Sequence, residues 1–234
     1  MITQDKKQAY KELLEKQKAL IKKVSKKSRR TNRAILVLYI IWILALLFGI
    51  IWPKFKHSGI IESGRFLYYV YFGLLAYFLF TFVHVIIHET GHLIFGLISG
   101  YRLQSFRIFS LTFVNIDGRI RRKKYAIRGT AGQCLMVPPG MNNDGSFPFV
   151  LYNLGGGLAN LIVSVPFLLA AIFTENATAA VFFIAFCAPG LMLAAANLIP
   201  LDLGVQNDGM NIRAMIKHEF LRESFYLQLI VYEE

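Results

Sequence analysis

The chain has 234 residues, which suits one domain or one modest bundle of membrane helices rather than several independent domains. It is 55% hydrophobic and 17% charged, with 20 Phe and 11 Tyr, so a disordered or collagen-like protein is excluded. The net charge of +12 is concentrated in residues 1–33, which hold 12 Lys/Arg. Because an apolar run follows directly, we expect contact with an anionic membrane surface and no nucleic-acid partner.

The basic arm, residues 1–33, is the first predicted element and is expected to be cytoplasmic. Its apolar residues recur at helical spacing among lysines, as in an amphipathic helix lying on a membrane. A solvated charged helix or a partly disordered arm fits the pattern equally well. Residues 34–52 form the first predicted transmembrane helix, which ends before Pro53-Lys54. No small-residue cleavage site is present, so this helix is expected to be a retained anchor.

Three later segments also reach the roughly 20 apolar residues that a bilayer crossing needs. They cover about 66–99, 148–173 and 177–199. The segment 66–99 has 34 residues, more than one crossing requires, and must therefore tilt, protrude or bend. The last two segments are separated only by 174–176 and are predicted to form a helical hairpin.

The distribution of Lys/Arg between the spans predicts their orientation, because basic residues stay on the cytoplasmic side. The arm contains 12, residues 53–65 three, residues 100–147 eight, the turn 174–176 none, and the tail after residue 200 three. Both termini and the 100–147 connection are therefore predicted to be cytoplasmic.

The connection between the second and third spans carries strand signals. Residues 106–116 alternate in part between apolar and polar side chains, and Asp117-Gly118 is a turn signal before 119–127. This pattern predicts a β-hairpin at the cytoplasmic membrane boundary. Residues 133–139 end in two prolines and are expected to be a shaped loop, and 213–234 a cytoplasmic amphipathic tail. The predicted fold is an all-α polytopic membrane protein with about four transmembrane helices and a small β-hairpin.

The second span contains the sequence His88-Glu89-Thr90-Gly91-His92. With five His and 14 acidic residues in the chain, a His-x-x-x-His pattern with an acidic residue in the second position is expected by chance only about 0.006 times. An ionisable side chain at mid-bilayer costs about 2.5–3.5 kcal/mol and needs a compensating partner. Two His four residues apart share a helix face and can bind one Zn²⁺, whose bound water Glu89 can deprotonate. This chemistry predicts peptide-bond hydrolysis.

A catalytic zinc ion needs a third protein ligand as well as an open position for water. The fourth span ends in Asn197-Leu-Ile-Pro200 and returns to the cytoplasmic side, nearer to which the two histidines lie. Asp202 and Asp208 follow, and either is a candidate ligand.

Together these motifs resemble the site-2 protease family of intramembrane zinc metalloproteases. The resemblance covers about 66–212 and is carried by His88-Glu-Thr-Gly-His92, Gly155-Gly-Gly-Leu-Ala-Asn160-Leu, Asn197-Leu-Ile-Pro200 and Asp208-Gly209. It implies that the zinc ligands are His88, His92 and Asp208, that Glu89 is the catalytic base, and that Asn160 and Asn197 support the scissile carbonyl or the substrate backbone.

The chain departs from the commoner family pattern, in which Asp-Gly directly follows a short proline-rich turn. Here residues 203–207 separate Asp202 from Asp208. Asp208 is favoured because Gly209 completes the Asp-Gly pair, and Asp202 stays a rival ligand. His84 lies four residues before His88, but the resemblance assigns it no ligand role, so we expect a hydrogen-bonded or water-facing side chain.

The implied function is that of an intramembrane zinc endopeptidase of the bacterial plasma membrane, acting within or next to a transmembrane segment of a peptide or single-span protein. The predicted hairpin would hold the unwound substrate by strand addition along 106–114. A non-proteolytic membrane immunity, sensor or binding protein that keeps the metalloprotease fold is one alternative. A small transporter that uses the polar span residues is another.

Overall fold

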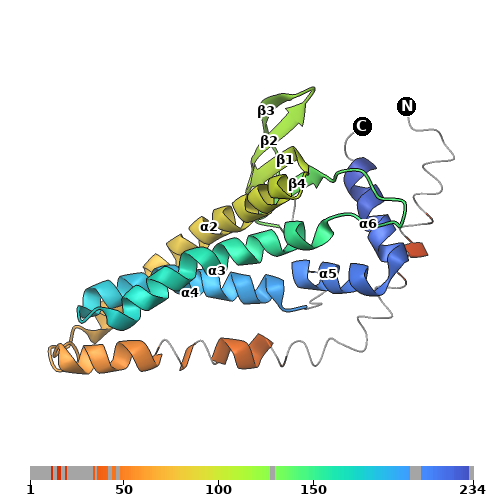
Figure 1. The fold of residues 1–234 in the computed structure, drawn as a ribbon. Helices are drawn as coiled ribbons and strands as arrows, with labels where there is room; N and C mark the ends of the chain where they lie inside the picture. Colours follow the sequence, from red (N-terminus) through yellow and green to blue (C-terminus); the bar gives the residue numbers. More distant parts are fainter. Residues whose placement is uncertain are drawn as a thin grey trace.

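The computed structural model describes residues 48–126, 130–200 and 207–231, together with 12, 15, 16, 19, 34, 36–41, 44 and 45. The basic arm therefore lies largely outside the described residues. Residues 48–57 are helical. The elements that follow are α2 (Phe66–Ile98), β1 (Arg102–Ile108), β2 (Leu111–Ile116), β3 (Arg119–Lys124), β4 (Gly132–Val137), α3 (Phe149–Phe173), α4 (Ala177–Leu198), α5 (Asp208–Lys217) and α6 (Glu219–Val231) (Figure 1).

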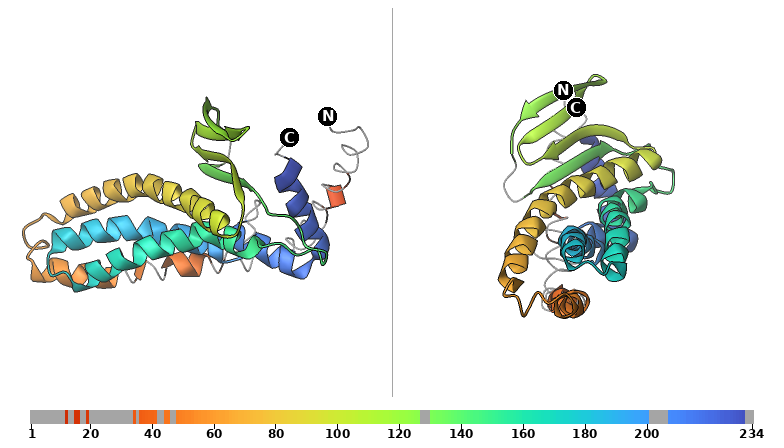
Figure 2. Two further views of the ribbon diagram at one scale, coloured as in Figure 1. Left: turned by 45° about the horizontal axis from the view of Figure 1, so that its top comes forward. Right: turned by 90° about the vertical axis from the view of Figure 1, so that its left-hand side faces the viewer.

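Helices α2, α3 and α4 are long and apolar enough to cross a membrane, and they pack against one another as a bundle (Figure 1). Each begins and ends within one residue of its predicted span. Helix α2 has 33 residues and curves along its length, as Figure 2 shows. Of the predicted span 34–52, the described positions are helical, and its crossing of the membrane stays a prediction.

Within the bundle, the backbones of α2 and α3 are in direct contact. A Cβ added at Gly91 would lie 2.3 Å from the carbonyl oxygen of Gly155, and one added at Gly155 would lie 2.7 Å from that of Gly91. Small residues are the usual means by which membrane helices approach so closely. Because Gly91 lies inside the His-Glu-x-x-His motif, this crossing sets the motif directly against α3.

The four strands form one antiparallel sheet in the order β3-β2-β1-β4. The predicted turn between β2 and β3 is present, with positive φ angles of 51° at Asp117 and 78° at Gly118, as a two-residue hairpin turn requires. The predicted hairpin is present as β2 and β3, but it is part of a larger sheet, because β1 also pairs with β2 and most of the expected loop 133–139 belongs to strand β4. Pro138 and Pro139 exclude a helix but do not prevent a strand from ending just before them.

The position of β4 also corrects the predicted substrate edge. Strands β1 and β2, which contain most of 106–114, are interior strands paired on both sides. The outer edges of the described sheet belong to β3 and β4. Of these two strands, β4 contacts α2, and a Cβ at Gly132 would lie 2.5 Å from Cγ of Glu89. The edge next to the motif is therefore that of β4.

The tail is two helices rather than one. At His218 the backbone is extended, with φ −135° and ψ 107°, and this separates α5 from α6. Both helices contribute to an apolar cluster with β4 and the start of α3, whose members include Met136, Tyr152, Met215 and Leu229. The sheet, α5 and α6 thus gather at one end of the bundle, and the turn 174–176 lies at the other (Figures 1 and 2).

Candidate metal centre

The structure brings His88, His92 and Asp208 together, although 116 residues separate the last two. His88 and His92 lie one turn apart on α2, and Asp208 is the first residue of α5. Oδ2 of Asp208 lies 3.5 Å from Nε2 of His88 and 3.3 Å from Nε2 of His92. The two Nε2 atoms are 3.2 Å apart. Three potential ligand atoms therefore form a nearly equilateral triangle.

This triangle has the size that zinc requires. Tetrahedral ligands at about 2.0–2.1 Å from a zinc ion lie about 3.3–3.4 Å from one another. Oδ2 of Asp208 is buried and accepts no hydrogen bond within the described residues. Burial alone would raise the pKa of Asp208, but the imidazoles of His88 and His92 lower it to about 2. Two neutral imidazole nitrogens and an ionised carboxylate are a donor set that fits zinc.

Asp208 is held in place by its neighbours on both sides. The side chain of Asn207 accepts from the backbone N–H of Met210 at 2.9 Å, which caps α5, and donates to the carbonyl of Ile199 at 2.6 Å. A Cβ at Gly209 would lie 2.3 Å from the carbonyl oxygen of Leu198. The Asp-Gly pair thus lets α5 start directly against the end of α4. The rival ligand Asp202 lies outside the described residues.

The ring of His92 is oriented by the backbone of α3. Its Nδ1 lies 2.8 Å from the carbonyl oxygen of Tyr152, which can only accept, so Nδ1 carries the hydrogen and Nε2 is left with its lone pair toward the triangle. The Tyr152 hydroxyl donates to the carbonyl of Cys134 in β4 at 2.8 Å. One residue therefore connects the candidate ligand to the edge strand.

The two asparagines implied by the resemblance lie in different surroundings. Nδ2 of Asn160 is 3.4 Å from Nδ1 of His88, on the side of that ring away from the triangle. Oδ1 of Asn160 is 3.0 Å from Nδ1 of His84. Asn197 donates to the carbonyl of Leu193 within its own helix at 2.9 Å. Of the two, only Asn160 is hydrogen-bonded to a candidate ligand in the described structure.

Arg107 is a residue of the site that the sequence did not single out. Its side chain is 1% exposed and donates to the carbonyls of Phe109 at 2.9 Å and Gly132 at 3.3 Å, and to the hydroxyl of Thr130. Gly132 in turn packs on Glu89, since a Cβ there would lie 2.5 Å from Cγ of Glu89. The available signal was a basic residue inside the apolar alternation of 106–116, but nothing in that pattern indicates its partners.

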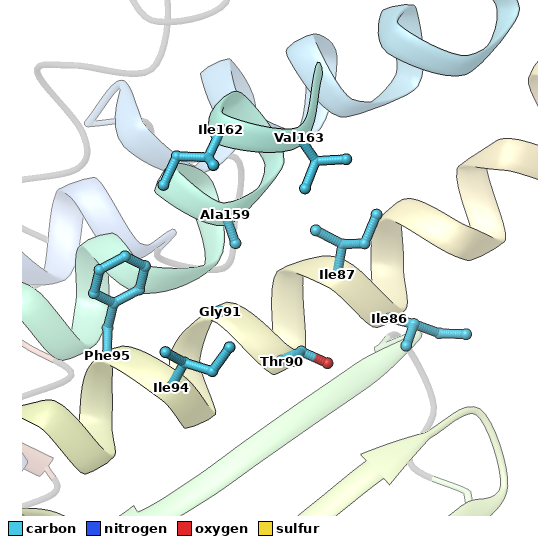
Figure 3. Close-up of a pocket in the computed structure, with 9 residues that line it drawn as sticks. All are labelled: Ile86, Ile87, Thr90, Gly91, Ile94, Phe95, Ala159, Ile162 and Val163. Atoms are coloured by element: carbon cyan, nitrogen blue, oxygen red, sulfur yellow. The ribbon is translucent and has the colours of Figure 1, made fainter. Parts of the chain in front are cut away.

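An apolar groove opens beside the motif between α2 and α3, with a volume of about 400 Å³ (Figure 3). Ile87 and Ile94 of α2 and Val163 of α3 are among its walls, and Thr90 brings the motif to its edge. Such a lining suits hydrocarbon, from a lipid or from an apolar side chain.

Comparison of the chain with protein-family models, with curated proteins and with solved structures finds no match. Function is therefore inferred from the site itself.

Proposed function

We propose that the chain is an intramembrane zinc metalloendopeptidase that hydrolyses peptide bonds within or next to a transmembrane segment of its substrate. The observation that supports this best is the triangle of His88, His92 and Asp208, with Glu89 on the same helical turn. The lengths of its sides suit a tetrahedral zinc ion, and a carboxylate beside such an ion is the base that peptide hydrolysis needs.

Bound by these three residues, a zinc ion would polarise the scissile carbonyl and lower the pKa of a water molecule. Glu89 is 8% exposed, and its carboxylate would be the group that accepts a proton from that water. Gly132 lies so close to Glu89 that a Cβ there would be 2.5 Å from Oε1. The start of β4 therefore limits the conformations of Glu89 and keeps its carboxylate at the site.

The substrate must present an extended backbone, because a helix hides its amides in its own hydrogen bonds. Strand β4 is an edge strand that begins against Glu89, so an unwound segment added to that edge near Gly132 would bring its peptide bonds close to the base. A membrane-embedded peptide or a single-span protein is the substrate class that such an arrangement serves.

The proposed setting is a multi-pass membrane protein with both termini in the cytoplasm, in a bacterial plasma membrane. The orientation is supported by the asymmetry of Lys/Arg between the connections. The bacterial membrane is supported by the family resemblance alone.

Replacement of Glu89 by Gln tests the activity while keeping the size of the side chain. Purified wild type and Glu89→Gln are incubated with single-span peptides, fragments are followed by mass spectrometry, and bound zinc is measured in both. We expect about one zinc per chain in each, and cleavage at least about 100-fold slower in the variant, since a general base contributes that much. Equal cleavage by both proteins would contradict the role of Glu89. Bound zinc without cleavage of any peptide would favour a non-proteolytic binding protein.

A further inference from the structure

A row of buried polar groups crosses the bundle behind His88. His84 and Asn160 are both 0% exposed. Nε2 of His84 is 2.9 Å from the carbonyl oxygen of Phe186 in α4, and Nδ1 of His84 is 3.0 Å from the Asn160 amide. The other end of that amide is 3.4 Å from Nδ1 of His88. The row thus joins a backbone carbonyl of α4 to a candidate zinc ligand of α2.

The two ends of this row determine where the hydrogens lie. The Phe186 carbonyl can only accept, so Nε2 of His84 carries a hydrogen, and a neutral imidazole has no second one for Nδ1. At the other end, Nε2 of His88 faces Asp208 and must keep its lone pair for a metal. The hydrogen of His88 therefore lies on Nδ1, which needs an acceptor.

Only one orientation of the Asn160 amide satisfies both histidines when a metal is bound. Its oxygen must accept from Nδ1 of His88, and its NH₂ must donate to Nδ1 of His84. As placed, the amide presents Nδ2 to His88 and Oδ1 to His84, and a rotation of about 180° exchanges the two atoms without moving either ring. Without that rotation, the hydrogen of His88 would block Nε2, and His84 would be a buried cation within a span.

We propose that Asn160 and His84 are positioning residues for the metal. In this row, which we call the relay, His88 donates to Asn160, Asn160 donates to His84, and His84 donates to the Phe186 carbonyl. The relay holds His88 in the tautomer that binds a metal through Nε2. His92 obtains the same tautomer from the Tyr152 carbonyl. The inference rests on the proposed function only in requiring a metal at the triangle.

Glycines hold both rings of this relay tightly. A Cβ at Gly190 would lie 2.3 Å from Cε1 of His84, and one at Gly156 would lie 2.5 Å from Cε1 of His88. Each ring therefore packs directly against the backbone of a neighbouring helix, at Gly190 for His84 and at Gly156 for His88. Ser164 also faces Gly190, and its buried hydroxyl has no hydrogen-bond partner within the described residues. Ser164→Ala is therefore a matched control that alters polarity at the same depth.

The test measures zinc affinity of the full-length, detergent-purified protein by competition with a chelator, and the visible absorption of bound Co²⁺ as a probe of ligand geometry. Asn160→Leu and His84→Phe remove the relay. Asn160→Asp restores an acceptor for His88, and His84→Gln restores both a donor and an acceptor. In Asn160→Leu and His84→Phe we expect about 10- to 100-fold weaker zinc binding and an altered Co²⁺ spectrum. In Asn160→Asp and His84→Gln the zinc affinity should stay within a few-fold of wild type. Ser164→Ala should change neither the affinity nor the spectrum.

Two results would overturn the relay while leaving the metal site intact. One is unchanged zinc affinity and Co²⁺ absorption in both Asn160→Leu and His84→Phe. The other is an equal loss of zinc affinity in Asn160→Leu and Asn160→Asp, and in His84→Phe and His84→Gln. Packing, rather than the direction of the hydrogen bonds, would then be responsible for the loss. A wild-type protein that takes up neither Zn²⁺ nor Co²⁺ would instead overturn the proposed function, and with it the relay.

Discussion

The charged side chain of Arg107 is buried and has no carboxylate within ion-pair distance in the described part of the chain. Its guanidinium is instead satisfied by the carbonyls of Phe109 and Gly132 and by Thr130. Gly132 is the first residue of β4 and the one that packs on Glu89. Arg107 therefore fixes the beginning of the edge strand over the candidate base.

Replacing Arg107 by Met should loosen the start of β4 and expose Cys134, which is buried two residues further on. Burial raises the pKa of the Cys134 thiol, so wild type should react slowly with a maleimide at pH 8, where the reactive thiolate is scarce. We expect labelling at Cys134 to be roughly tenfold faster in Arg107→Met, which corresponds to about 1.4 kcal/mol of opening free energy. Mass spectrometry locates the label, and Arg121→Met on exposed β3 is the control. Equal rates in both variants would refute this role.

At the scale of single residues, the sequence predicted what is local to a helix. The i,i+4 spacing of His88 and His92 is sufficient to place both on one face, and Gly209 marked the aspartate that the structure brings to them. The contacts of Arg107 with Gly132, and of Asn160 with His84, join different elements across 25 and 76 residues. Spacing carries no information about such pairs, because they depend on how the elements pack.

Among the elements, the three helices long and apolar enough to cross a membrane were predictable, because length and hydropathy are properties of each segment alone. Strand β4 was not, since its identity depends on pairing with β1, a strand about 30 residues earlier in the chain. The alternation in 106–116 revealed β2 and its turn but gave no sign that β1 would be paired on both sides. The sequence therefore predicted the substrate-binding edge along 106–114, which belongs mostly to strands that are interior in the sheet.

The role of β4 as a docking edge can be tested in the substrate, which avoids damage to the sheet. In a cleavable single-span peptide, N-methyl groups are placed one at a time along the segment before the scissile bond. Every second N–H of an added strand points to its neighbour, so sensitivity should alternate with a period of two residues. Each sensitive position should slow cleavage about tenfold, the worth of one hydrogen bond of about 1.4 kcal/mol. Uniform tolerance, or an uninterrupted block of sensitive positions, would argue against strand addition at β4.

The whole molecule is asymmetric along the bundle axis. The sheet, with five Lys/Arg among the six exposed residues of β3, lies at the same end as α5 and α6. The opposite end contains the turn 174–176, where Lys54 donates to the carbonyl of Ile172 at 3.1 Å near the end of α3. The histidines lie six to ten residues before the end of α2, or roughly 9–15 Å at 1.5 Å per residue. The candidate site thus belongs to the sheet-bearing half, which the charge distribution predicts to be cytoplasmic.

Two engineered cysteines test this orientation, one in β3 and one in the turn at the opposite end. Cys134 and Cys187 are buried and are first replaced by Ala to give a silent background. Lys123→Cys and Glu175→Cys then place single thiols at exposed positions. A membrane-impermeant maleimide added to intact spheroplasts should label Glu175→Cys at once, and Lys123→Cys only after permeabilisation, because eight Lys/Arg hold the 100–147 connection inside. The reverse pattern would place the metal triangle in the outer half of the membrane, and substrates would then have to reach it from the extracytoplasmic side.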